Sequence, residues 1–221
     1  MKRTSKPLSL GLVALVCFFL GNGFAHADTI YVANSGNNTI EEFDSSGTGS
    51  VFANSGLNHP HGLAFDSSGN LYVANYLGNT IEKFDSSGTG SVFASGLNWP
   101  RGLAFDSSGN LYVANSGEHT IEEFDSSGTG SVFHNFTSSL HPQCLAFESS
   151  GNLYVSMNRV AGGNPEIKKI DLIGNESVFA SSGLNDPWGI AVQVPEPATW
   201  GLLALGASAL LGGLRLRRRS S

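Results

Sequence analysis

The sequence predicts an all-β fold of four four-stranded sheets, because one unit of about forty residues is repeated along the chain. YVAN tetrads begin at Tyr31, Tyr72 and Tyr112, and the variant YVSM begins at Tyr154, so the steps are 41, 40 and 42 residues. A fixed period of this length indicates a repeat architecture, in which neighbouring units bury each other's apolar faces. Each unit contains four short stretches with strand character, and four up-and-down strands per repeat are typical of a β-propeller blade.

The second unit shows the four predicted strands most clearly. They are GLAFD from Gly62, NLYVAN from Asn70, TIEKFD from Thr80 and SVFAS from Ser91. The first two are apolar on both faces, as sheets covered on both sides require, whereas the third alternates. The connecting DSSGN and DSSGTG segments place Asp first and Gly where a positive φ is needed, so they predict tight hairpin turns.

The two ends of the repeat region complement each other. Residues 28–34 begin with a second strand that lacks its own GLAFD, and residues 188–192 (WGIAV) form a first strand without a following partner. We expect these N- and C-terminal strands to pair, so that residues 28–57 and 188–194 form one composite blade and no edge stays open. The alternative is that the four blades form an open arc that pairs with another copy.

Three further blades follow the composite one, starting near Gly62, Gly102 and Cys144. The last of them is degenerate, because residues 159–165 replace the usual short loop. The count of four is the lower limit for propellers.

Residues 1–27 have the features of a secretory signal peptide. Three basic residues precede a continuous apolar stretch over residues 8–20, and residues 25–27 (AHA) form a small-x-small cleavage pattern. We therefore expect the repeat region to be exported.

The other end has three parts in a fixed order. Pro195, Glu196 and Pro197 are followed by 17 uncharged, mostly apolar residues at 198–214, and then by four arginines. The apolar stretch is long enough for a short transmembrane helix, and the arginines place its far end in the cytoplasm. This arrangement resembles the PEP-CTERM sorting signal. The resemblance implies a Gram-negative bacterium, temporary anchoring in the inner membrane, cleavage by an exosortase-type protease, and then a cell-surface or extracellular location.

The charge of residues 28–194 excludes one class of partner. Five basic residues stand against 17 acidic ones, a net charge of −12 with His neutral. Such a body repels phosphate backbones, so we expect no nucleic-acid partner. Cys144 is the single cysteine of this region. It therefore offers no internal disulfide and no Cys-based metal cluster, and we interpret it as a small buried residue.

The residues at 60–81 and 100–121 read P-x-G-L-A-F-D-x-x-G-N-L-Y-V-A-N-x-x-x-x-T-I. This pattern resembles the NHL repeat, and it is equally similar to the gluconolactonase-like and streptogramin-lyase propellers. The resemblance therefore implies a propeller superfamily and not one reaction.

Candidate ligand-binding residues flank the repeated proline. In an up-and-down blade, the loops that lead into the first strand and out of the second lie on one face, and there the copies differ, as a specific site requires. Imidazole, guanidinium, indole and carboxylate groups around one opening suit a small anionic or carbohydrate ligand. The candidates are His59, His61, Trp99, Arg101, His141, Gln143, Asp186 and Trp188.

Metal and acid–base chemistry have weaker support. We predict no cofactor; His59, His141 and Asp186 are the candidates for a metal site, but no short His-x-x-x-His or Cys motif supports them. Glu118 and His119 form a candidate acid–base pair, although other copies carry Asn at the position of His119, so it is better explained as a turn residue. The Asp residues of the DSSG turns supply one carboxylate each, which favours turn capping over Ca²⁺ binding.

The sequence thus predicts a non-catalytic, exported propeller that binds a protein or polysaccharide partner. The alternative is a metal-dependent hydrolase or lyase of the gluconolactonase or streptogramin-lyase type, which would bind a divalent ion in its channel.

Overall fold

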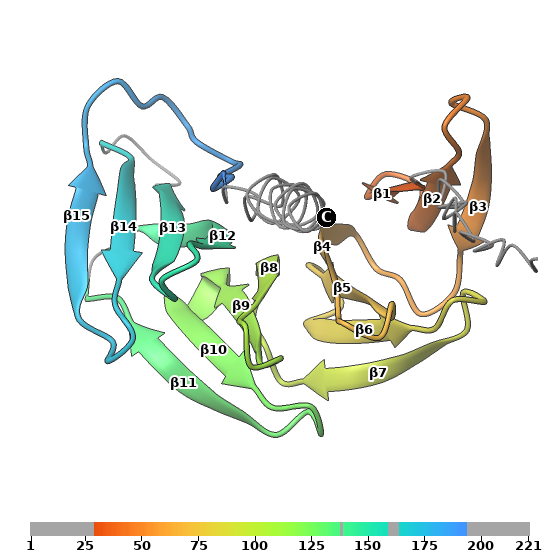
Figure 1. The fold of residues 1–221 in the computed structure, drawn as a ribbon, viewed down its shortest axis with the longest axis horizontal. Coiled ribbons are helices and arrows are strands. Elements are labelled where there is room, and N and C mark those ends of the chain that lie inside the picture. Colours follow the sequence, from red (N-terminus) through yellow and green to blue (C-terminus); the bar gives the residue numbers. More distant parts are fainter. Residues whose placement is uncertain (1–28, 138, 159–163, 194–221) are drawn as a thin grey trace, which may run out of the picture.

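The structure, a computed structural model, describes residues 29–137, 139–158 and 164–193. The predicted signal peptide, most of the irregular loop at 159–165 and the predicted transmembrane helix lie outside these ranges. No helix within them is long and apolar enough to cross a membrane. The strands form four antiparallel sheets that follow one another around an arc (Figure 1).

Three of the four sheets have the predicted four strands, and the first has three. The first two sheets consist of β1 Ile30–Asn34, β2 Thr39–Phe43 and β3 Gly49–Ala53, followed by β4 Pro60–Phe65, β5 Leu71–Asn75, β6 Thr80–Phe84 and β7 Gly90–Ser95. The last two consist of β8 Pro100–Phe105, β9 Leu111–Asn115, the 3-10 helix η1 Ser116–Glu118, β10 Thr120–Phe124 and β11 Gly130–Asn135, followed by β12 His141–Phe147, β13 Leu153–Asn158, β14 Glu166–Ile170 and β15 Glu176–Ala180.

The hairpin turns confirm the reading of the DSSG segments as Asp-capped turns. The carboxylate of Asp85 accepts hydrogen bonds from the Ser87 hydroxyl at 2.6 Å and from the backbone N–H groups of Ser87 at 2.8 Å and Thr89 at 3.1 Å. Gly88 takes a φ of +77°, the left-handed conformation that glycine adopts without strain. The acidic residue is used within its own turn.

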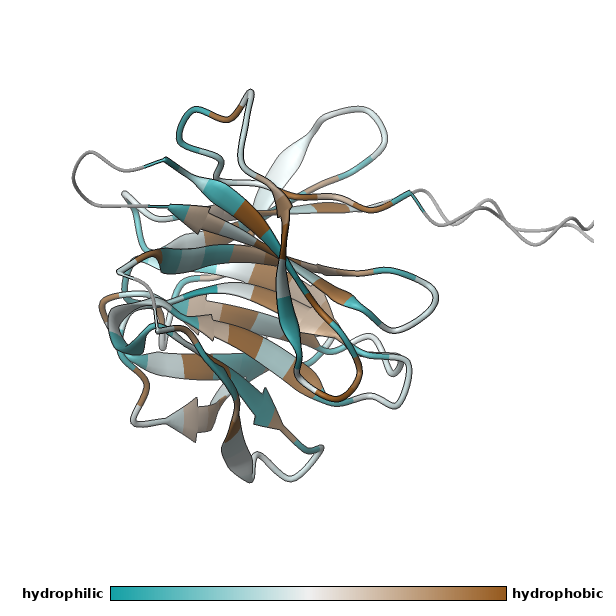
Figure 2. Cartoon of the chain, turned by 90° about the vertical axis from the view of Figure 1, so that its left-hand side faces the viewer, coloured by the Kyte–Doolittle hydropathy of each residue, from teal (hydrophilic) through white to brown (hydrophobic). Residues whose placement is uncertain are grey.

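A tyrosine at the start of each YVAN tetrad joins neighbouring sheets. The ring of Tyr72 lies edge-on to Phe93 of its own sheet at 4.9 Å and to Phe105 of the next sheet at 5.0 Å. Tyr112 makes the equivalent two contacts, with Phe133 and Phe147. Hydrophobic residues accordingly lie along the stacked strands (Figure 2), and the β14–β15 turn also carries the exposed Leu172 and Ile173. The core is thus a series of equivalent joints between sheets.

Glycine sets the spacing of the innermost strands. A Cβ added to Gly62 in β4 would lie 2.1 Å from the carbonyl oxygen of Arg101 in β8, and one added to Gly102 would lie 2.6 Å from that of Gln143 in β12. Neither position has room for a side chain. Cys144 has the equivalent place in β12 and is only partly buried, in contrast to the prediction of a buried residue.

The predicted closing strand does not form in the described chain. Residues 188–193 contain no strand, and β1 is hydrogen-bonded to β2 alone within its sheet, so the composite blade of residues 28–57 and 188–194 is not assembled. The first and last sheets stand at opposite ends of an open arc (Figure 1). Trp188 instead lies against the guanidinium of Arg101, in a pocket that Ser35 also lines.

Candidate functional site

Three residues that directly precede the repeated proline share one backbone geometry. His59, Trp99 and Asp186 each have a φ of 54°, a left-handed conformation uncommon outside glycine. In the two central loops the preceding sheet holds this conformation, because the N–H of His59 donates to Asn38 Oδ1 at 2.6 Å and that of Trp99 donates to Asn79 Oδ1 at 3.0 Å. The backbone conformation before the proline is therefore the same in these units, although the side chains at that position differ.

Tyr76 lies at the centre of the largest group of varied side chains. Its ring stacks on that of His61, with 4.7 Å between centroids and an interplanar angle of 22°. The guanidinium carbon of Arg101 lies 4.4 Å from the Tyr76 centroid and 4.9 Å from that of Trp188. Nδ1 of His59 lies 3.1 Å from Nε2 of His61. Side chains from three separate parts of the chain therefore meet around one guanidinium group.

Arg101 has a charge without a counter-charge in this group. Its Nε and Nη1 atoms are buried and lack a hydrogen-bond partner in the structure. A buried polar group without a partner costs free energy, and a charged one costs more. The group borders an open pocket of about 310 Å³, lined by Ser35, His61, Gly62, Arg101, Gly102, Gln143, Cys144 and Trp188.

The imidazole ring of His61 does not add positive charge at neutral pH. Burial, followed by the nearby charges of Arg101 and His59, lowers the pKa of His61 from 6.5 to about 4. His61 is therefore neutral at pH 7. Arg101 is then the charged side chain among the residues that line the pocket, and it favours an anion there.

His141 belongs to a neighbouring group. Its ring lies 4.3 Å from that of His119, and its Nδ1 lies 2.8 Å from the carbonyl oxygen of Ser116. Gln143 donates to the carbonyl oxygen of His141 at 3.0 Å, while its own Oε1 is buried without a partner. Gln143 and Arg101 thus line the same pocket, and each has buried polar atoms without a hydrogen-bond partner.

His119 takes the backbone role predicted for it. Its φ of 59° matches the values of 57° at Asn38 and 58° at Asn79, as expected for a residue that replaces a turn asparagine. Glu118 accepts a hydrogen bond from Asn98 at 2.8 Å. This contact directs the carboxylate of Glu118 to the Asn98 side chain.

The structure brings together some of the sequence-predicted candidates. His61, Arg101, Gln143 and Trp188 line one pocket, and His59 adjoins it through His61. Trp99 lies 6.0 Å from Tyr76 at the rim and is 43% exposed. The other two stand apart: His141 pairs with His119, and Asp186 is exposed. No three His, Cys, Asp or Glu side chains gather as a metal site within the described ranges, so His59, His141 and Asp186 do not form one there.

Sequence reasoning missed Tyr76, which organises the pocket. Comparison of the repeats could have identified it, because Ser35 and Ser116 hold the equivalent position directly after YVAN and only this unit has an aromatic residue there.

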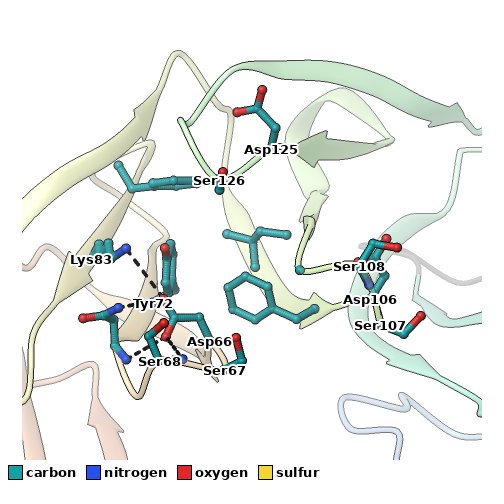
Figure 3. Close-up of a pocket in the computed structure, with 15 residues that line it drawn as sticks. Asp66, Ser67, Ser68, Tyr72, Lys83, Asp106, Ser107, Ser108, Asp125 and Ser126 are labelled. Carbon is teal, nitrogen blue, oxygen red and sulfur yellow. Dashed lines mark hydrogen bonds and ion pairs between the residues drawn. The ribbon is translucent and has the colours of Figure 1, made fainter.

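A second type of pocket lies on the face of the DSSG turns. The one between the second and third sheets measures about 420 Å³, and Figure 3 shows Asp66, Asp106 and Asp125 around it. Asp66 pairs with Lys83 at 3.6 Å. A similar pocket of about 360 Å³ lies between the third and fourth sheets. Because these pockets recur with the repeat and their carboxylates cap turns, we assign them to the framework.

The stacked antiparallel sheets, three of them with four strands and one with three, define a β-propeller protein. More particularly, the chain carries NHL repeats at residues 57–84 and 97–124 and a PEP-CTERM protein-sorting motif at residues 193–219. A comparison with curated protein sequences gives no match.

Solved structures share the fold at low sequence identity. Virginiamycin B lyase from Staphylococcus aureus is 15% identical with a TM-score of 0.59, over 70% of this chain and 53% of that one. A chain of a nidogen/laminin complex is 20% identical with a TM-score of 0.60, over 71% and 62%. A gluconolactonase from Xanthomonas campestris is 15% identical with a TM-score of 0.50, over 55% and 47%. The matched part thus spans about half to three fifths of these chains.

Proposed function

We propose that this protein is an exported binding module that recognises a carboxylate-bearing saccharide of the cell surface through Arg101, without catalysis. The observation that carries the proposal is the guanidinium of Arg101, which has buried donors without partners beside an open pocket. A guanidinium group binds carboxylates through directed, charge-assisted hydrogen bonds.

The surroundings of Arg101 favour a sugar over a simple ion. The ring of Tyr76 contacts the guanidinium, and Trp99, 6.0 Å from Tyr76, is 43% exposed. Carbohydrate sites combine such apolar ring faces with a few fixed polar groups. Gln143 lines the same pocket as a further polar side chain.

The sorting motif supports a location where such ligands occur. The PEP-CTERM motif indicates export, membrane-anchored sorting and recognition by an exosortase. In this proposal the host is a Gram-negative bacterium, and the repeat region is delivered past the inner membrane to the surface or the medium. There it meets polysaccharide, or a protein that carries an acidic side chain in the same place.

Calorimetric titration with an oligogalacturonate and with a neutral oligosaccharide of the same length tests the proposal. We expect the acidic sugar to bind in preference, and Arg101→Gln to weaken binding about 10- to 100-fold, as for loss of a charge-assisted hydrogen bond. Lys83→Gln is the matched control, because it removes the same charge on the DSSG face and should leave binding unchanged. Equal binding of both sugars, or equal effects of the two variants, would contradict the proposal.

A second candidate function is a metal-dependent hydrolase or lyase. It is favoured by the lyase and gluconolactonase among the solved structures of this fold and by the paired rings of His119 and His141. Tight binding of a divalent ion that is lost in a His119→Ala, His141→Ala variant, together with turnover of a lactone, would favour this function over the binding module.

A further inference from the structure

The first strand of the arc is exposed where its copies are buried. β1 has the sequence IYVAN, and β5 and β9 have LYVAN. Val73 and Val113 are fully buried, but Val32 is 42% exposed, and Ile30 is 61% exposed. The difference arises because β5 and β9 each lie between two strands, whereas β1 lacks an innermost strand beside it.

The chain also contains an innermost strand without a sheet. Residues 187–192 read PWGIAV, in register with PHGLAF of β4 and PRGLAF of β8. In the structure these residues form no strand, and Trp188 is 54% exposed. Each copy therefore carries both missing parts of one blade, unpaired.

These two parts are not paired within one copy, although Trp188 and Ser35, which directly follows β1, line the same pocket. Pro60, the first residue of β4, follows the end of β3 by seven residues, and Pro187 follows the end of β15 by the same number. Residues 187–192 are therefore expected to be the innermost strand of the sheet that would follow the fourth. The first sheet stands at one end of the arc and the last sheet at the other, and β1 is the innermost strand of the first sheet (Figure 1). The chain matches about half of the longer solved propellers, 52% and 53% of the two lyases. The arc thus has the extent of half a ring.

We propose that the missing half is a second copy of this chain, and that residues 187–192 of each copy pair with β1 of the other. Both joints are then identical, as two-fold symmetry requires. Each three-stranded sheet gains its fourth strand, and two arcs of four sheets give a ring of eight, within the usual range of four to eight blades. The exchange removes both open edges, which are otherwise prone to uncontrolled pairing.

The internal repeats fix the register of this pairing. Leu63 is opposite Val73, Leu103 is opposite Val113, and Leu145 is opposite Val155. By the same register, Ile190 of one copy lies opposite Val32 of the other. Trp188 then leaves Arg101 and takes the inner-strand position that His61 has in β4, while Tyr76 stays against Arg101.

Disulfide trapping between two tagged full-length chains tests the proposal. One chain carries Val32→Cys and the other Ile190→Cys, with Cys17 and Cys144 replaced by Ser in both, and the two are co-expressed. Directly opposite residues of antiparallel strands have Cα atoms about 4.5–5.5 Å apart, which suits a disulfide. We expect a cross-linked heterodimer on mild oxidation and, for the parent protein, a dimeric mass by light scattering.

A register-shifted pair is the control. Ala191→Cys in place of Ile190→Cys points to the other face and should cross-link at least tenfold less. A parent protein of monomeric mass overturns the proposal, as does a Val32→Cys, Ile190→Cys double variant that cross-links only within one chain. Deletion of residues 187–193 should convert the dimer to a monomer that keeps the strand content of the arc, and a dimer that survives this deletion also contradicts the proposal.

Discussion

The guanidinium carbon of Arg101 lies 4.4 Å from the centre of the Tyr76 ring, so a charged side chain of the third sheet rests on an aromatic ring of the second. The same ring stacks on His61. Tyr76 therefore orients Arg101 toward the pocket and covers part of its apolar stem.

Replacing Tyr76 with Ser should weaken ligand binding without loss of the fold. Ser35 and Ser116 hold the equivalent position in other units, so serine is compatible with this backbone. Loss of a cation–π contact worth about 0.5–1 kcal/mol predicts a roughly two- to fivefold lower affinity for oligogalacturonate. Calorimetry measures the affinity, and circular dichroism checks the fold. An unchanged affinity would show that the ring does not orient Arg101.

A methyl group at Gly62 should destabilise the protein. The added carbon would lie 2.1 Å from a backbone carbonyl oxygen of β8, which cannot move aside independently. We expect Gly62→Ala to lower the free energy of unfolding by about 1–3 kcal/mol, as for overpacking. Gly36→Ala is the control, because nothing lies within 4 Å of its added carbon. Urea unfolding of both variants measures the difference, and similar midpoints would show that the innermost strands are not in such close contact.

Stability should depend on pH through His61. The pKa of His61 is about 4 in the folded protein, because of burial and then of Arg101, and its ordinary value is 6.5. The unfolded chain therefore binds the proton first, and the contribution of neutral His61 is full above pH 6.5 and declines as the pH falls toward 4. The free energy of unfolding of His61→Gln should fall less over this window than that of the parent. Parallel curves for the two proteins between pH 7 and 4 would be inconsistent with a buried, neutral His61.

The DSSG turns should give a second, more acidic dependence. Hydrogen bonds from the serine hydroxyl and from backbone N–H groups lower the pKa values of Asp44, Asp85 and Asp125 below 3.8. The stabilisation is present at neutral pH and is lost as the pH falls below 3.8 through the folded-state values. A triple variant with Ser at these positions should lose less stability between pH 5 and 2 than the parent. Unfolding midpoints in urea across this range provide the measurement, and an equal loss in both proteins would mean that these turns are not capped in solution.

Local features of the fold could be predicted from the sequence because each depends on residues close together in the chain. The strands of the second sheet and the Asp-capped turns follow from the apolar pattern and the turn residues around Asp85. The absence of closure could not be predicted in this way, because the curvature of the arc depends on how each pair of sheets packs. Contacts such as that between Gly62 and the backbone of Arg101 set this packing.

The candidate site was predictable in part for the same reason. Comparison of the copies identified His61, Arg101 and Trp188, which line the pocket. It did not identify Tyr76, whose role arises from contacts with His61 of its own sheet and Arg101 of the next. It also grouped His141 with His59, although the structure pairs His141 with His119.

The tyrosine–phenylalanine contacts between sheets have a consequence for the evolution of the number of repeat units. Tyr31, Tyr72 and Tyr112 each contact one phenylalanine of their own sheet and one of the next, with nearly the same geometry. Any unit therefore presents the surface that its neighbour needs. Duplication or loss of one whole unit in the gene would preserve every remaining joint, so the number of units can vary during evolution without a new core having to arise.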